Sequence, residues 1–117
     1  MNQGSAFSVF RKWRDNLTTL RVDTELGVIS FSLECTLMRV EEPLLSFLLA
    51  DCGFIEFRFD ESWVFDFVAL DALRVEMEKR VGDSPLGTRR YEYGEGVIAT
   101  RVKTGSRMIL AEVVREV

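Results

Sequence analysis

The feature that most constrains the fold is a pair of apolar segments within residues 44–59, which the turn sequence Asp51-Cys52-Gly53 separates. A glycine after two turn residues is typical of a three-residue hairpin loop, in which it takes the left-handed backbone conformation. The pattern therefore predicts a hairpin with strands near 44–50 and 54–60. Because the first segment is apolar on both of its faces, we expect both faces to be covered, one by the interior and one by an N-terminal helix.

The clearest alternation in the chain precedes this hairpin and predicts a long strand over 28–40. From Ile29 to Leu37 every second residue is apolar, and the intervening ones are mostly polar. After Leu37 the phase slips by one residue, which indicates a β-bulge or a sharp bend. Long bent strands are typical of small barrels, where one strand serves both halves.

Other segments complete a mainly β pattern. Apolar residues at three- and four-residue steps predict a helix over 5–16, whose aromatic face must pack on the rest of the protein. Residues 63–80 fit either a strand or a helix, with a strand favoured near 63–68, and 81–90 read as a loop. The remaining predicted strands lie near 19–26, 63–68, 96–103 and 107–116.

These elements predict one domain over 1–117, mainly β with α+β possible: a small barrel or strongly bent sheet with an N-terminal helix. The helix, the strand ending at Gly27, the bent strand and the apolar hairpin resemble the Sm-like and SH3-like small barrels over about half of the chain. The plan also resembles that of small bacterial proteins. The Asp-x-x-Met-Asn motif with which Sm proteins stack uridine has no counterpart, since Glu41-Glu42-Pro43-Leu44 follows the bent strand. The resemblance therefore implies a fold but not RNA binding.

Composition excludes several kinds of chemistry. The 117 residues include no histidine, which removes imidazole bases and catalytic triads. Only two cysteines are present, Cys35 and Cys52, and they are too few and too far apart for a zinc site. We expect both to be buried free thiols in a cytoplasmic protein, or a disulfide if their strands face each other. No apolar run approaches the roughly 20 residues of a membrane span, no signal peptide is evident, and no cofactor is expected.

Acidic residues supply the first candidate site. Residues 23–62 contain nine acidic side chains and two arginines, whereas the chain as a whole carries a net charge of −4. Glu41, Glu42, Asp60 and Glu61 lie at predicted strand ends, where they could meet as an acidic interaction surface. The same carboxylates could alternatively bind a divalent cation or act as acids and bases. Asp66, between two phenylalanines, is expected to point outward.

Basic residues supply a second candidate site. Arg11, Lys12 and Arg14 in the predicted helix, with Arg89 and Arg90 near Tyr91, interleave cations with aromatic rings. That combination can stack on and neutralise nucleic acid. The excess of acidic residues argues against this use of the patch.

The leading expectation is a non-catalytic cytoplasmic protein-interaction module with an acidic face, which binds a protein partner or associates with itself. The first alternative is an Sm-like RNA-binding protein that uses the basic helix. The second is a metal-dependent enzyme that uses carboxylates.

Overall fold

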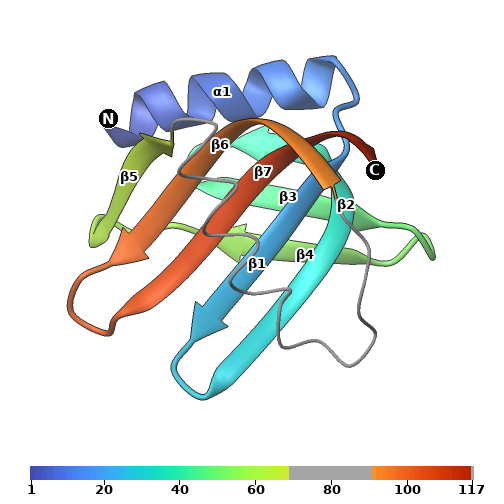
Figure 1. Ribbon diagram of the computed structural model, residues 1–117. Helices are drawn as coiled ribbons and strands as arrows, with labels where there is room; N and C mark the ends of the chain where they lie inside the picture. The colour runs from blue at the N-terminus through green and yellow to red at the C-terminus, as the bar shows by residue number, and fades with distance from the viewer. Residues whose placement is uncertain (69–90, 117) are drawn as a thin grey trace.

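The computed structural model describes residues 1–68 and 91–116 as one helix and seven antiparallel strands (Figure 1). The strand order across the sheet is β4-β3-β2-β1-β7-β6-β5. A mainly β architecture with one short helix is thereby confirmed. The elements are α1 (Gln3–Asp15), β1 (Leu20–Leu26), β2 (Ile29–Glu41), β3 (Leu44–Leu49), β4 (Phe54–Arg58), β5 (Trp63–Val68), β6 (Tyr91–Arg101) and β7 (Ser106–Glu116).

Helix α1 begins two residues before its predicted start, because Asn2 caps it. The Asn2 side-chain oxygen accepts a hydrogen bond from the Ser5 backbone N–H at 2.8 Å, which satisfies one of the free amides of the first turn. The helix ends at Asp15, before Asn16. Its buried face consists of Ala6, Phe7, Phe10 and Trp13.

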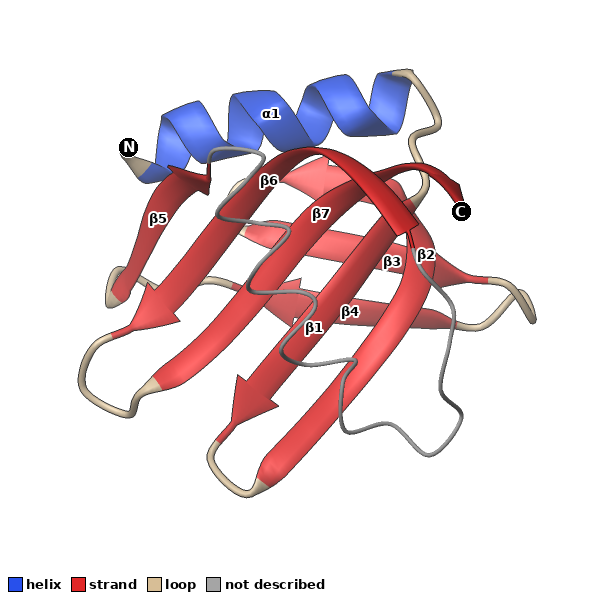
Figure 2. Cartoon of the chain, in the orientation of Figure 1, coloured by secondary structure: helices blue, strands red, loops and turns tan. Residues whose placement is uncertain are grey.

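The sheet curves strongly, and α1 lies across one end of the curve (Figure 2), where it packs on β2 and β5. The inner face of the sheet and the buried face of α1 form the main core. Phe59, which follows β4, is fully buried and lies at the centre of an aromatic cluster. Its ring centroid is 5.1 Å from that of Phe65, 5.4 Å from that of Trp63 and 6.3 Å from that of Phe7. The helix, β4 and β5 therefore meet at one side chain.

The predicted closed barrel is not confirmed, because the sheet ends at β4 on one side and at β5 on the other. These two strands follow one another in the chain and diverge from a short loop (Figure 1). Aromatic side chains fill the space beside that loop, as in the edge-to-face contact of Phe57 with Trp63. Side-chain packing, without backbone hydrogen bonds between β4 and β5 in the part of the chain that is described, brings the two ends of the sheet together.

The predicted bulge in β2 is confirmed. The pairing of β2 with β3 shifts between Leu37 and Arg39, so that Met38 is the extra residue. The expectation that β3 is covered on both faces is wrong. Helix α1 packs on the inner face, the same side as the core, and Leu48 on the outer face is exposed.

The turn between β3 and β4 differs from the expectation in its backbone. Cys52, not Gly53, has the left-handed conformation, with φ of 68°. The Asp51 side chain accepts a hydrogen bond from the Gly53 N–H at 2.9 Å, which fixes the turn one residue earlier than expected. Cys52 is exposed, so the prediction of two buried thiols is wrong for it; Cys35 is buried, and both are free. Burial raises the pKa of the Cys35 thiol to about 12.

Strands β5 and β6 agree with the sequence-based predictions to different degrees. Residues 63–68 form a strand, in which Asp66 is exposed as the alternation predicts. Strand β6 begins at Tyr91, five residues before its predicted start. The rest of the ambiguous segment, 69–80, and the predicted loop 81–90 lie outside the described residues. The single helix that the structure describes is not long and apolar enough to cross a membrane.

Candidate interaction surface

The two acidic pairs singled out in the sequence lie at the same end of the sheet. Glu41 and Glu42 are at the turn from β2 to β3, and Asp60 and Glu61 are in the loop after β4. The backbone N–H of Phe59 donates a hydrogen bond to the carbonyl oxygen of Pro43 at 2.9 Å, which ties the turn to the loop. All four carboxylates are exposed. We call these four residues the acidic end.

Two of these carboxylates are already neutralised by arginines. Glu41 accepts a hydrogen bond from Arg39 at 2.6 Å, and this contact holds the pKa of its carboxyl below the usual range. Asp60 forms an ion pair with Arg101 at 3.1 Å. Glu42 and Glu61 have no ion pair with any residue that the structure describes. The free negative charge of the acidic end therefore comes from Glu42 and Glu61.

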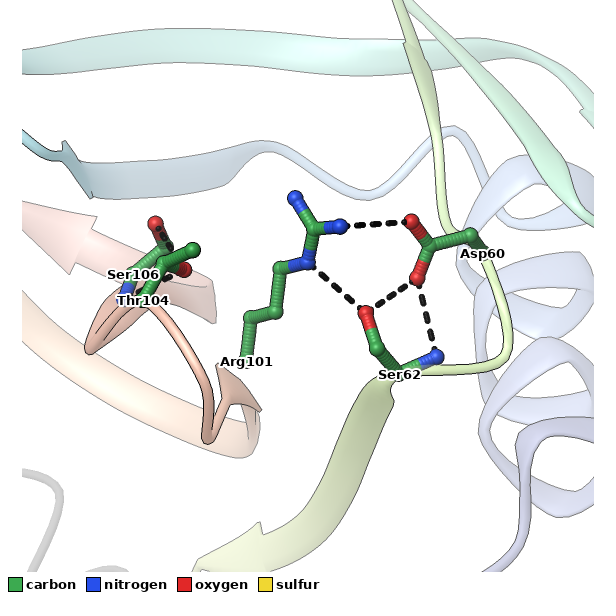
Figure 3. A network of polar contacts seen from close by, with 5 residues as sticks. All are labelled: Asp60, Ser62, Arg101, Thr104 and Ser106. Atoms are coloured by element: carbon green, nitrogen blue, oxygen red, sulfur yellow. Dashed lines mark hydrogen bonds and ion pairs between the residues drawn. The ribbon is translucent and has the colours of Figure 1, made fainter.

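Asp60 belongs to a polar network that connects two strands (Figure 3). One of its carboxylate oxygens accepts hydrogen bonds from the backbone N–H of Ser62, at 2.8 Å, and from the Ser62 hydroxyl. The Arg101 Nε donates to the same hydroxyl at 2.7 Å. Hydrogen bonds from Ser62 and the charge of Arg101 lower the pKa of the Asp60 carboxyl. The network joins the start of β5 to the end of β6, which makes it structural.

The carboxylates do not form a metal site within 1–68 and 91–116, where no group of three or more His, Cys, Asp or Glu side chains is placed to hold an ion. Glu41 and Asp60 are instead paired with Arg39 and Arg101.

The predicted basic patch is divided by ion pairs. Lys12 binds Glu95 at 2.8 Å and Arg14 binds Asp15 at 3.0 Å. The hydrogen bond to Glu95 raises the pKa of Lys12. Trp13, between the two cations, is buried in the core and offers no exposed ring to a base. Arg11 is exposed, and Arg89 and Arg90 lie outside the described residues.

An open groove of about 870 Å³ adjoins the end of α1. Lys12 and Glu95 stand at its wall with Glu112 of β7, whose carboxylate lies over Gly94. A Cβ added at position 94 would be 2.7 Å from Glu112 Oε1, so the glycine makes room for this side chain. The other lining residues are Asn16, Thr18, Phe67 and Val68.

A buried polar group lies on the outer face of β1. Asp23 accepts a hydrogen bond from the Ser32 hydroxyl, while its other carboxylate oxygen has no hydrogen-bond partner within 1–68 and 91–116. The Arg21 guanidinium lies 5.3 Å from the ring centre of Tyr91 and 3.7 Å from Asp23. Burial raises the pKa of nearby Tyr93 to about 12. Alternation placed Arg21 and Asp23 on the polar side of the strand and gave no signal of this burial.

The surface that the sequence analysis missed is the outer face of β2, β3 and β4. Met38, Leu48 and Phe54 are 47%, 37% and 61% exposed on this face, and we call them the outer apolar group. Leu48 lies directly opposite Phe54 in the β3–β4 pairing, and Met38 is the bulge residue on the next strand. The phase slip after Leu37 was the available signal, because a bulge turns one further side chain outward.

Comparison of the chain with protein-family models, with curated proteins and with solved structures gives no match.

Proposed function

We propose that the protein is a non-catalytic protein-interaction module whose partner binds the outer face of β2, β3 and β4. The observation that carries the proposal is the exposure of the outer apolar group (Met38, Leu48 and Phe54) on three adjacent strands. Contiguous apolar side chains on a sheet face commonly mark a protein contact, whereas single exposed ones need no explanation.

The acidic end makes the two ends of this surface chemically different. The outer apolar group lies toward the β3–β4 turn, and the acidic end lies at the other end of the same strands. From Leu48 to Leu44 the chain advances four residues, which is about 13 Å in a strand. A matching partner presents an apolar side chain and, beyond that span of roughly 13 Å, a basic group that meets Glu42 and Glu61, because both acids lie past the strand ends. Desolvation of the apolar contact supplies affinity, and the charges supply orientation.

The two alternatives rank below this proposal. Binding of RNA by an Sm-like surface would need free cations and exposed rings, but Lys12 and Arg14 are paired with carboxylates and Trp13 is buried. Metal-dependent catalysis would need convergent free carboxylates, but Glu41 and Asp60 are each paired with an arginine.

Selection from a displayed library of random peptides tests the proposal. We expect the enriched peptides to combine apolar residues with Lys or Arg, and to shift the backbone NMR signals of β2, β3 and β4. Phe54→Ser, or Glu42→Lys combined with Glu61→Lys, should each weaken binding about tenfold or more, which corresponds to about 1.4 kcal/mol. Val102→Ser removes an equally exposed apolar side chain from the β6–β7 turn and should leave binding unchanged.

The proposal fails if the enriched peptides bind all variants equally, or if their signals map to α1 or β6. Enrichment of peptides without basic residues would remove the role of the acidic end. Failure to enrich any peptide while RNA is retained at moderate salt would favour the first alternative.

A further inference from the structure

The outward backbone groups of β4 form an open edge. Leu49 N–H donates to Gly53 O at 2.8 Å, and Phe59 N–H donates to Pro43 O at 2.9 Å. In an antiparallel pair, hydrogen-bonded and non-hydrogen-bonded positions alternate. The backbone groups of Ile55 and Phe57 therefore point toward β3, whereas those of Phe54, Glu56 and Arg58 point away from it. Because β4 ends the sheet, no strand pairs with these three residues in the part of the chain described.

This edge lacks several of the features that usually protect edge strands, although its five residues include the charged Glu56 and Arg58. The β3–β4 pairing runs from Leu44–Arg58 to Leu48–Phe54 without a register shift, so no bulge twists the edge away. The strand contains no proline or lysine, and three of its five residues, Phe54, Ile55 and Phe57, favour strand structure. Ile55 and Phe57 point to the inner side and yet remain partly exposed. An additional strand beyond β4 would cover them.

The charges on β4 indicate what pairs with it. Arg58 is exposed and has no ion pair with any described residue. Among the described residues, the exposed Glu56 accepts one hydrogen bond, a contact of 3.4 Å from the Ser46 hydroxyl, and its charge contributes to raising the pKa of Arg39. In a two-fold antiparallel pair centred on Phe57, Glu56 of each copy lies opposite Arg58 of the other. This register also suits the backbone, since the N–H and C=O groups of Glu56 and Arg58 point to the open edge.

The other symmetric registers fit less well. A two-fold axis at Glu56 would place two glutamates directly opposite each other, which is unfavourable. An axis at Ile55 would leave Arg58 opposite Cys52 in the turn and would pair Glu56 with Phe54. Among two-fold axes that lie within β4, only the one at Phe57 forms two opposite-charge pairs.

We propose that β4 pairs with β4 of a second copy of this chain, through a two-fold axis at Phe57. Two reciprocal Glu56–Arg58 pairs flank the axis and join the two sheets into one. The contact is isologous and closes at a dimer. A single strand pair buries less surface than a standard interface, so the dimer is weak and depends on concentration. The proposal goes beyond the binding of a partner by the outer apolar group, and neither requires the other.

Sedimentation equilibrium over a range of protein concentrations tests the proposal with charge variants. Wild type should show a reversible monomer–dimer equilibrium. Glu56→Arg and Arg58→Glu each replace two attractive pairs by two repulsive ones, and each should raise the dissociation constant by about tenfold or more. The double variant restores both pairs with reversed sign and should return the dissociation constant to within about threefold of wild type.

Thermal melts provide the control for folding, because both side chains are exposed and the swaps should leave the melting temperature nearly unchanged. Val64→Ser, on the opposite edge strand β5, should leave the dimer unaffected. A protein that is monomeric at all concentrations would overturn the proposal, as would a dimer that the double variant fails to restore. A monomer whose β4 amides become protected by an added extended peptide would show that a foreign strand, not a second copy, uses this edge.

Discussion

At the scale of single residues, Thr24 is a site where the fold tolerates an unfavourable group. Its side chain is fully buried on the inner face of β1, and its hydroxyl has no hydrogen-bond partner among the residues that the structure describes. A buried hydroxyl without a partner costs about 1–3 kcal/mol. Valine has nearly the same shape, so Thr24→Val should raise the free energy of unfolding by about 1 kcal/mol, measured by urea denaturation.

The reverse change on the same strand face is the matched control. Val22→Thr adds a hydroxyl to a fully apolar site and should lower the free energy of unfolding by about 1–3 kcal/mol. Destabilisation by Thr24→Val would show that the hydroxyl has a partner, for instance a bound water molecule.

Cys52 is a second residue that costs the fold stability, because its left-handed backbone conformation suits glycine better than a residue with a side chain. A residue with a side chain pays about 1–2 kcal/mol in this conformation, and glycine's greater freedom in the unfolded chain offsets part of that gain. Cys52→Gly should therefore raise the melting temperature by about 2–5 °C, a shift that corresponds to somewhat less than 1 kcal/mol for a domain of this size. Cys52→Ala removes the thiol but keeps the strained backbone, and should give no increase. An equal gain from both variants would assign the effect to the thiol.

At the scale of elements, periodicity was informative wherever one strand face meets the core. The alternation from Ile29 to Leu37 and its phase slip predicted both β2 and its bulge, because each further residue turns the side chain to the other face. The same reasoning fails for the outer face of β3, because the pattern predicts that Leu48 is covered and the structure shows it exposed. Alternation shows that a face is apolar, but not which element, if any, packs on it.

The network of Asp60, Ser62 and Arg101 also acts at the element scale, and it predicts an acid dependence. The pKa of Asp60 is lowered in the folded protein, so its contribution to stability is present above about pH 4, the ordinary carboxyl pKa, and is lost as the pH falls further. The melting temperature of wild type should therefore fall more steeply below this pH than that of Asp60→Asn.

Asp66→Asn is the control, because Asp66 is an exposed carboxylate on β5 without a hydrogen bond or ion pair to any described residue. The melting temperature of the Asp66→Asn variant should fall with pH in the same way as that of wild type. Parallel curves for Asp60→Asn and wild type would show that the network in Figure 3 adds no stability.

At the scale of the whole molecule, the sequence predicted which acids lie together but not what neutralises them. Glu42 and Glu61 lie at the same end of the sheet because the outer ends of the two hairpin strands share that end, which is a local consequence of the chain path. Arg101 reaches Asp60 from β6, on the far side of the sheet order. Such a pairing depends on how the sheet curves. That curvature comes from packing between α1, β4 and β5, which the alternation within single strands does not encode.

Phe59 is where this packing can be tested. It is fully buried, and its ring contacts the rings of Phe7 in α1, Phe57 in β4 and Trp63 and Phe65 in β5. Because the sheet is not closed by hydrogen bonds, these contacts hold its two ends and the helix together. Phe59→Ala should lower the free energy of unfolding by about 3–5 kcal/mol, whereas Phe54→Ala, on the exposed face of the adjacent strand, should change it by about 0.5 kcal/mol or less. Hydrogen exchange should speed up in α1 and β5 more than in β1 and β7, since the central strands keep both neighbours. Uniform acceleration across the sheet would show instead that the curvature is set within the strands, independently of the aromatic cluster.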